Sequence, residues 1–149
     1  MRTLSGLKEF IYTLEGMGEL RKISMPVDRH YEIPAILHQM GGDNAPAIFF
    51  ERVKGYTMPI VGNLLGTRRR LALALGISDD DVALGKGLNL DKKISPFLLK
   101  EETERVVLAL NGESDIQEFL PVLTHYEKDT GPFITSAITS ARNPVSGIT

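Results

Sequence analysis

The stretch that decides the fold is Pro59-Ile-Val-Gly-Asn-Leu-Leu-Gly-Thr-Arg-Arg-Arg-Leu-Ala-Leu-Ala-Leu-Gly76. An apolar, β-prone run leads into a turn bounded by two glycines, and good helix formers follow. Thr67 stands at an N-cap position, because its hydroxyl can accept from a free N–H of the first turn. Gly76 stands where helices commonly end on a left-handed residue. The pattern predicts a strand, a tight loop and a helix, which is half of a layered α/β unit.

Three arginines, Arg68 to Arg70, occupy the first turn of this predicted helix. The helix dipole disfavours positive charge there, so the pattern indicates that carboxylates or phosphates approach from elsewhere. The free N–H groups of a helix start also attract anions, which makes the loop the first place to look for a site. A solvated basic face is the alternative.

Composition sets limits on the class of protein. The chain has 149 residues, 42% of them hydrophobic, with a formal net charge of -2. This length fits one domain, or one domain and a piece of another. The charge gives no general attraction to nucleic acid or anionic membranes, and no apolar run approaches the ~20 residues of a membrane span. The absence of cysteine excludes disulfides and thiolate sites, and we expect a cytoplasmic protein.

The apolar spacing before this stretch predicts a helix over 7–17, a strand over 20–27, a helix over 32–40 and a strand over 47–50. Ser5 is the expected N-cap of the first helix and Asp28 that of the second. Pro34 is tolerated because it falls near a first turn.

After this stretch the pattern predicts a helix from Ser78, a linker over 85–100, a strand over 104–110 and a turn at 111–112. It then predicts a helical turn over 116–120, an extended segment over 121–125, a strand over 133–139 and a turn over 143–147. The aspartates at 79–81 suit a helix start, and a hard-cation site there has no separate support. A hairpin partner begins at Ile148 and stops, so we expect an incomplete hairpin. We expect the segment after Gly131 to be poorly ordered or to associate through its exposed edge.

The three histidines provide no recognisable metal site. His30 and His38 lie eight residues apart without a third ligand at zinc-site spacing, which fits surface or capping residues. His125 stands before a Gly-Pro turn with acidic neighbours, where a functional and a structural role both remain open. No hydrolase triad or HExxH helix is recognisable. We therefore assign no catalytic residue and no metal ligand.

Taken together, several stretches resemble the N-terminal part of the UbiD-type decarboxylases, which depend on prenylated FMN. The resemblance covers nearly the whole chain. It is carried by residues 7–21, with Leu-Lys-Glu-Phe and Gly-Glu-Leu-Arg; 46–56, with Pro-Ala-Ile-Phe-Phe-Glu-Arg-Val-Lys-Gly-Tyr; 59–76; and 120–144, with Leu-Pro-Val-Leu-Thr-His, Asp-Thr-Gly-Pro-Phe-Ile-Thr and Asn-Pro.

The resemblance implies a small layered N-terminal α/β domain over 1–110, in the α/β (α+β) class. Residues 111–149 would be the first strands of a flavin-binding split β-barrel, which is incomplete. The implied activity is reversible, non-oxidative decarboxylation of an aromatic or α,β-unsaturated carboxylic acid. Prenylated FMN, Mn²⁺ and K⁺ serve the full-length family, and we expect this chain alone to bind none of them. Thr135 and Thr149 are the candidates for contact with the flavin.

The sequence departs from the family pattern at its end. The family's Asn-x-x-x-x-Arg motif, its metal ligands and its catalytic Glu-Arg-Glu set have no counterpart up to Thr149. Whether the chain is itself an enzyme is therefore open. The first hypothesis is a fragment or split subunit that needs the remaining decarboxylase domains or a partner subunit, within an oligomer. The alternatives are a non-catalytic assembly or regulatory subunit, and a small anion-binding module using residues 66–68 and Arg70.

Overall fold

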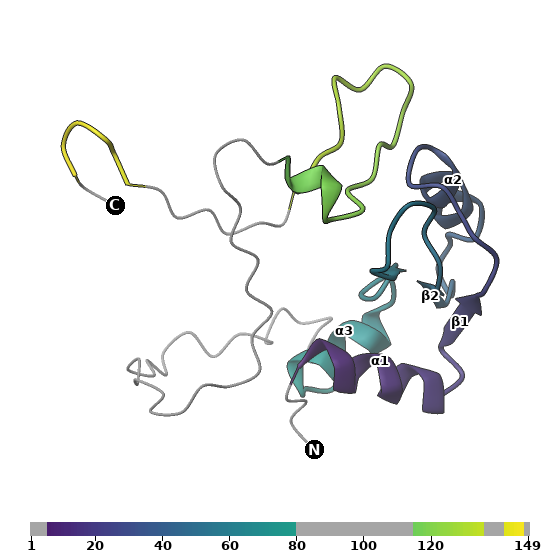
Figure 1. Cartoon of the computed structure of the whole chain (residues 1–149). Coiled ribbons are helices and arrows are strands. Elements are labelled where there is room, and N and C mark those ends of the chain that lie inside the picture. The colour runs from purple at the N-terminus through teal and green to yellow at the C-terminus, as the bar shows by residue number, and fades with distance from the viewer. Residues whose placement is uncertain (1–5, 80–114, 136–141, 148–149) are drawn as a thin grey trace.

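The computed structural model describes residues 6–79, 115–135 and 142–147. The elements, in order, are α1 (Leu7–Gly16), β1 (Leu20–Ile23), α2 (Glu32–Gln39), β2 (Ala47–Phe50), β3 (Ile60–Gly62), α3 (Arg68–Leu75) and the 3-10 helix η1 (Ile116–Glu118) (Figure 1). Each of these elements was predicted from the sequence in type and order.

The three strands form one sheet in the order β1-β2-β3. β1 pairs with β2 in parallel, with Leu20 opposite Ala47. β2 pairs with β3 antiparallel, with Ile48 opposite Gly62. Because parallel strands need a crossover between them, α2 connects β1 to β2 in a β-α-β unit. The layered α/β class expected from the sequence is confirmed.

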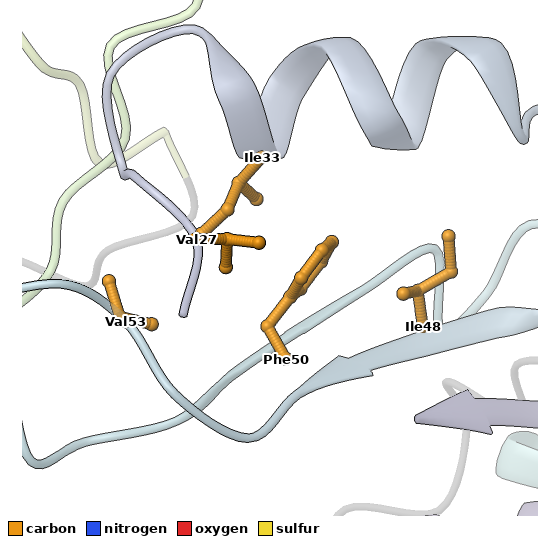
Figure 2. Packing of buried hydrophobic residues seen from close by; sticks show 5 residues of the cluster. All are labelled: Val27, Ile33, Ile48, Phe50 and Val53. Atoms are coloured by element: carbon orange, nitrogen blue, oxygen red, sulfur yellow. The ribbon is translucent and has the colours of Figure 1, made fainter. Parts of the chain in front are cut away.

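One face of the sheet packs against α2. Ile48 and Phe50 alternate along β2, so their side chains point to the same face. They form a buried cluster with Ile33 of α2 and with Val27 and Val53 from the loops (Figure 2). This cluster is the larger of the two cores.

The opposite face of the sheet packs against α1 and α3. Ala47, whose side chain points away from that of Ile48, is buried with Phe10 and Leu14 of α1, and Leu73 of α3 packs against them. In Figure 1, α1 and α3 lie together at one end of the fold. The first part of the chain is therefore a three-layered domain, with helices on both faces of its sheet.

Two expected helix caps differ from the structure. The N-cap of α1 is Gly6, while Ser5 lies outside the described residues. The N-cap of α2 is Tyr31, with a φ of 62°, so the prediction of Asp28 as the cap is wrong. The carboxylate of Asp28 instead accepts from the backbone N–H of His30 at 2.9 Å. It therefore stabilises the turn that precedes the helix.

Two predicted strands are shorter than expected. β1 ends at Ile23 rather than at Val27, which forms only an isolated parallel bridge with Val53. Within the predicted strand 133–139, the described part, 133–135, belongs to no strand. The turn over 143–147 is confirmed, because the N–H of Gly147 donates to the carbonyl of Asn143 at 2.8 Å.

Several predictions fall outside the described residues. They are the body of the helix from Ser78, the linker 85–100, the strand 104–110, the turn 111–112 and the hairpin partner from Ile148. Within the described ranges, no helix is long and apolar enough to cross a membrane.

Candidate functional site

Helix α3 has both of the caps predicted from the sequence, and its N-cap ends the loop that leads from β3. The Thr67 hydroxyl accepts from the N–H of Arg70 at 3.2 Å, and Gly76 is left-handed with a φ of 69°. Asn63 has a φ of 55°, in the region that Asn tolerates better than most residues. A Cβ at Gly66 would lie 1.8 Å from Oδ1 of Asn63, so the loop closes only with glycine at that position.

Arg70 lies in the first turn of α3 and donates to carbonyls of this loop. Only 1% of its surface is exposed. Its Nε donates to the carbonyl of Leu64 at 3.0 Å, and its Nη2 donates to the carbonyls of Ala45 at 2.8 Å and Asn63 at 3.1 Å. Its Nη1 donates to the Glu19 carboxylate at 3.4 Å. A buried charge is tolerated when it is paired and hydrogen-bonded, and Arg70 meets both conditions.

Arg69, the neighbour of Arg70, has a different environment. Its guanidinium lies 3.2 Å from the Glu19 carboxylate, but 63% of its side chain is exposed. The carboxylate that approaches these two arginines is therefore that of Glu19 in the same domain, and no second domain or subunit is needed to supply it. Because Arg70 is buried and its guanidinium donates within the fold, it is not available to an external anion.

A groove of about 920 Å³ runs between α2 and the segment after Thr124. It is lined by Tyr31, Pro34, Ala35, Leu37, His38, His125, Tyr126 and Glu127. The fold thus brings together two of the histidines that the sequence places far apart. Among the described residues, no group of three or more His, Cys, Asp or Glu could hold a metal ion.

His30 lies apart from that groove and pairs with Asp28. Its Nδ1 lies 3.2 Å from the Asp28 carboxylate. The pKa of Asp28 is lowered from its ordinary value of 3.8, chiefly because the backbone N–H of His30 donates to the carboxylate. The interpretation of His30 as a surface residue near a helix start agrees with this exposed pair.

A second groove, of about 360 Å³, contains Thr135. It is lined by Met58, Pro59, Ile60, Leu120, Pro121, Val122, Leu123, His125, Phe133, Ile134 and Thr135. Thr149, the other flavin candidate, lies outside the described residues. Among the described lining residues there is no lysine, arginine or carboxylate. They supply apolar walls, the Thr135 hydroxyl and the His125 imidazole, and this set does not suffice for a flavin phosphate and its metal.

The sequence reasoning missed a contact between the two main described parts of the chain. Nη1 of Arg29 donates to the carbonyl of Val122 at 2.8 Å, and the Tyr56 hydroxyl donates to the carbonyl of Gln117. These partners lie 93 and 61 residues apart in sequence. No local pattern signals such a pairing, because it exists only after both parts have folded.

Comparison with known families accounts for both parts. Residues 11–84 match the family model of the 3-octaprenyl-4-hydroxybenzoate carboxy-lyase N-terminal domain, UbiD_N. Residues 99–149 match the model of the Rift-related domain of the same carboxy-lyase, UbiD. The two matches are in the order that the resemblance implied. The chain belongs to the UbiD family and corresponds to its N-terminal region.

Solved structures agree with this assignment. An evolved dimeric form of the UbiD-class enzyme HmfF from Pelotomaculum thermopropionicum, in complex with prFMN, is 32% identical with a TM-score of 0.74. The match covers 94% of this chain and 32% of that one. The chain thus spans about a third of the length of this relative.

A second relative was solved in two forms. The vanillic acid decarboxylase of Sedimentibacter hydroxybenzoicus in closed form is 29% identical, with a TM-score of 0.72, over 89% of this chain and 29% of that one. Its open form with truncated ShVdcD is 31% identical, with a TM-score of 0.50, over 57% of this chain and 19% of that one.

Proposed function

We propose that this chain is the N-terminal part, or a split subunit, of a prenylated-FMN-dependent decarboxylase. The reaction would be the reversible, non-oxidative decarboxylation of an aromatic or α,β-unsaturated carboxylic acid. The observation that carries the proposal is the paired match to the N-terminal and Rift-related domains of a carboxy-lyase. The HmfF structure with prFMN and the vanillic acid decarboxylase, both similar to this chain, support the cofactor and the reaction class.

The proposal gives the two parts different tasks. Residues 1–110 would form the supporting α/β domain, and residues 111–149 would begin the flavin-binding barrel. Thr135 would contribute a hydroxyl at the edge of the flavin site, beside the apolar walls of the second groove. When bound, prenylated FMN would supply the decarboxylation chemistry, with Mn²⁺ and K⁺ as further cofactors. The described residues do not suffice to hold the cofactor by themselves.

Activity would require the remaining decarboxylase domains or a partner subunit, in an oligomer located in the cytoplasm. The dimeric form of HmfF supports the oligomer. A non-catalytic assembly or regulatory subunit is the competing proposal.

The test compares the chain alone with the chain plus the missing parts. The 149-residue protein is incubated with prenylated FMN and MnCl₂ and passed through gel filtration. We expect no flavin absorbance to co-elute with it. When the remaining domains are supplied, as a continuous chain or as a partner subunit, we expect retained flavin and release of carbon dioxide from an aromatic acid.

A matched pair of variants tests the threonine. In the complemented protein, Thr135→Val should reduce flavin retention, whereas Thr130→Val, on the exposed turn nearby, should not. Flavin retention and decarboxylation by the 149-residue chain alone would contradict its expected incompetence. A complemented protein that retains flavin without releasing carbon dioxide would favour the assembly subunit.

A further inference from the structure

Arg29 reaches from the first domain to the segment 117–124. Its Nη1 donates to the carbonyl of Val122 at 2.8 Å and lies 3.4 Å from Oε1 of Gln117. Its guanidinium carbon lies 5.7 Å from the centre of the Tyr56 ring, within the range of a cation–π contact. The side chain is half-buried, so water competes only partly for these contacts.

Tyr56 and two backbone bonds hold the same segment. The Tyr56 hydroxyl donates to the carbonyl of Gln117. The N–H of Tyr31 donates to the carbonyl of Thr124 at 3.0 Å, and the N–H of Thr124 donates to the carbonyl of Arg29 at 3.3 Å. Thr124 is buried by this bridge.

The other contacts of the segment are apolar and lie at its centre, where Pro121 is buried. Leu123 packs against the core cluster under α2. Ile116 and Phe119, at the ends of the η1 turn, are 43% and 41% exposed. Polar contacts with Arg29, Tyr56 and the Tyr31 backbone add to this packing and fix the segment at Gln117, Val122 and Thr124.

Both grooves depend on where this segment lies. Residues 120–123 line the groove that contains Thr135, while Tyr126 and Glu127 line the groove beside α2. His125 lines both. A shift of the segment would therefore change both grooves at once.

We infer that Arg29 and Tyr56 are positioning residues that join the Rift-related segment to the N-terminal domain and thereby shape the groove containing Thr135. The role of that groove in flavin binding rests on the proposed function, but the joint itself does not. Arginine suits this place because its planar guanidinium can donate to two acceptors and lie over an aromatic ring at once. Lysine offers a point charge and no comparable plane.

The test measures amide hydrogen exchange in the full 149-residue chain without flavin. In Arg29→Met, the amides of Tyr31 and Thr124 should exchange about tenfold faster, since hydrogen bonds to charged groups are among the stronger ones. The amides of Ala47 and Glu51, which donate to Glu19 and Ile23 across the β1–β2 pair, should stay within about twofold. Arg29→Lys should restore part of the protection at Tyr31 and Thr124.

Two matched variants complete the design. Tyr56→Phe removes only the hydroxyl and should speed exchange at Thr124 by about threefold to tenfold, which also tests the joint if Arg29→Met fails to fold. Arg21→Met, on the exposed side of β1, is the control and should change neither pair of amides. The inference is overturned if Tyr31 and Thr124 exchange as in the original protein. It is equally overturned if exchange becomes faster to the same degree at Tyr31, Thr124, Ala47 and Glu51, because Arg29 would then stabilise the whole fold. Neither result depends on flavin, so failure here is distinguishable from failure of the proposed function.

Discussion

The two main described parts of the chain are held in different ways. Residues 6–79 form a three-layered domain whose sheet is covered on both faces by apolar side chains, with Arg70 buried among carbonyl groups. Residues 115–135 pack only a few apolar side chains, Leu123 and the buried Pro121 among them, and are further attached through hydrogen bonds from Arg29 and Tyr56. The first part contains its own hydrophobic core, whereas the second packs against the core of the first.

This difference predicts which parts of the chain each substitution should destabilise. A change at the centre of the first domain removes the surface on which the second segment lies, so both parts are affected. A change in the segment removes only local contacts, because the two core clusters of the first domain lose little. Substitutions can therefore be ranked by which part they reach.

The largest effect is expected from Arg70→Met. It removes the Arg70 donor from the carbonyl of Leu64 and one of two donors from each of the carbonyls of Ala45 and Asn63. Glu19 also loses its buried partner, and the expected cost is about 3–5 kcal/mol in the free energy of unfolding. Urea unfolding followed by circular dichroism measures the loss. Arg69→Met is the control, because an exposed ion pair contributes about 0–1 kcal/mol. Equal losses in the two variants would contradict the role given to Arg70.

Leu123→Ala should separate the two parts. A half-buried leucine contributes about 1–2 kcal/mol, less than a fully buried one, so the segment should open while the first domain remains folded. Faster amide exchange at Thr124 with unchanged exchange at Ala47 is the expected result. Leu65→Ala, at a side chain that is already exposed, should affect neither amide. Full unfolding by Leu123→Ala would show that the first domain depends on the segment.

Thr67→Ala should weaken the first domain without reaching the second. The variant loses the side-chain acceptor for the N–H of Arg70, which typically costs about 1 kcal/mol. Thermal unfolding measures the difference against Thr57→Ala, an exposed position in the loop before β3. A loss no greater than in the control would mean that the cap contributes nothing to stability.

The smallest effect is a dependence on pH at Asp28. Its pKa is lowered in the folded state, so its contribution is complete above the ordinary value of 3.8 and disappears as pH falls through the lower, folded value. The stability difference between the original protein and Asp28→Asn should therefore stay constant down to about pH 5 and shrink as the pH falls below 3.8. Asp43→Asn is the control at an exposed position. A difference that grows on acidification would contradict the assigned direction.

Local hydrogen bonding explains which features the sequence revealed. The helix from Arg68 to Leu75 was predictable with both caps, since Thr67 and Gly76 interact with groups only a few residues away. The order of strands and helices followed from apolar periodicity, because the spacing of apolar side chains along one element is also a property of neighbouring residues. The prediction of Asp28 as the cap of α2 was wrong because the cap is Tyr31, which has a positive φ. The N–H of Tyr31 donates to the carbonyl of Thr124, a residue that is distant in the sequence.

What the sequence determined by itself is the family, the order of elements in the first domain and the stretch from Pro59 to Gly76 as its organising loop. The tertiary structure alone decided that Arg70 is an internal residue and that Arg29 and Tyr56 reach the second segment. The physical reason is distance along the chain. Caps and turns are closed by neighbours, whereas buried arginines and joints between parts acquire partners only when remote segments meet.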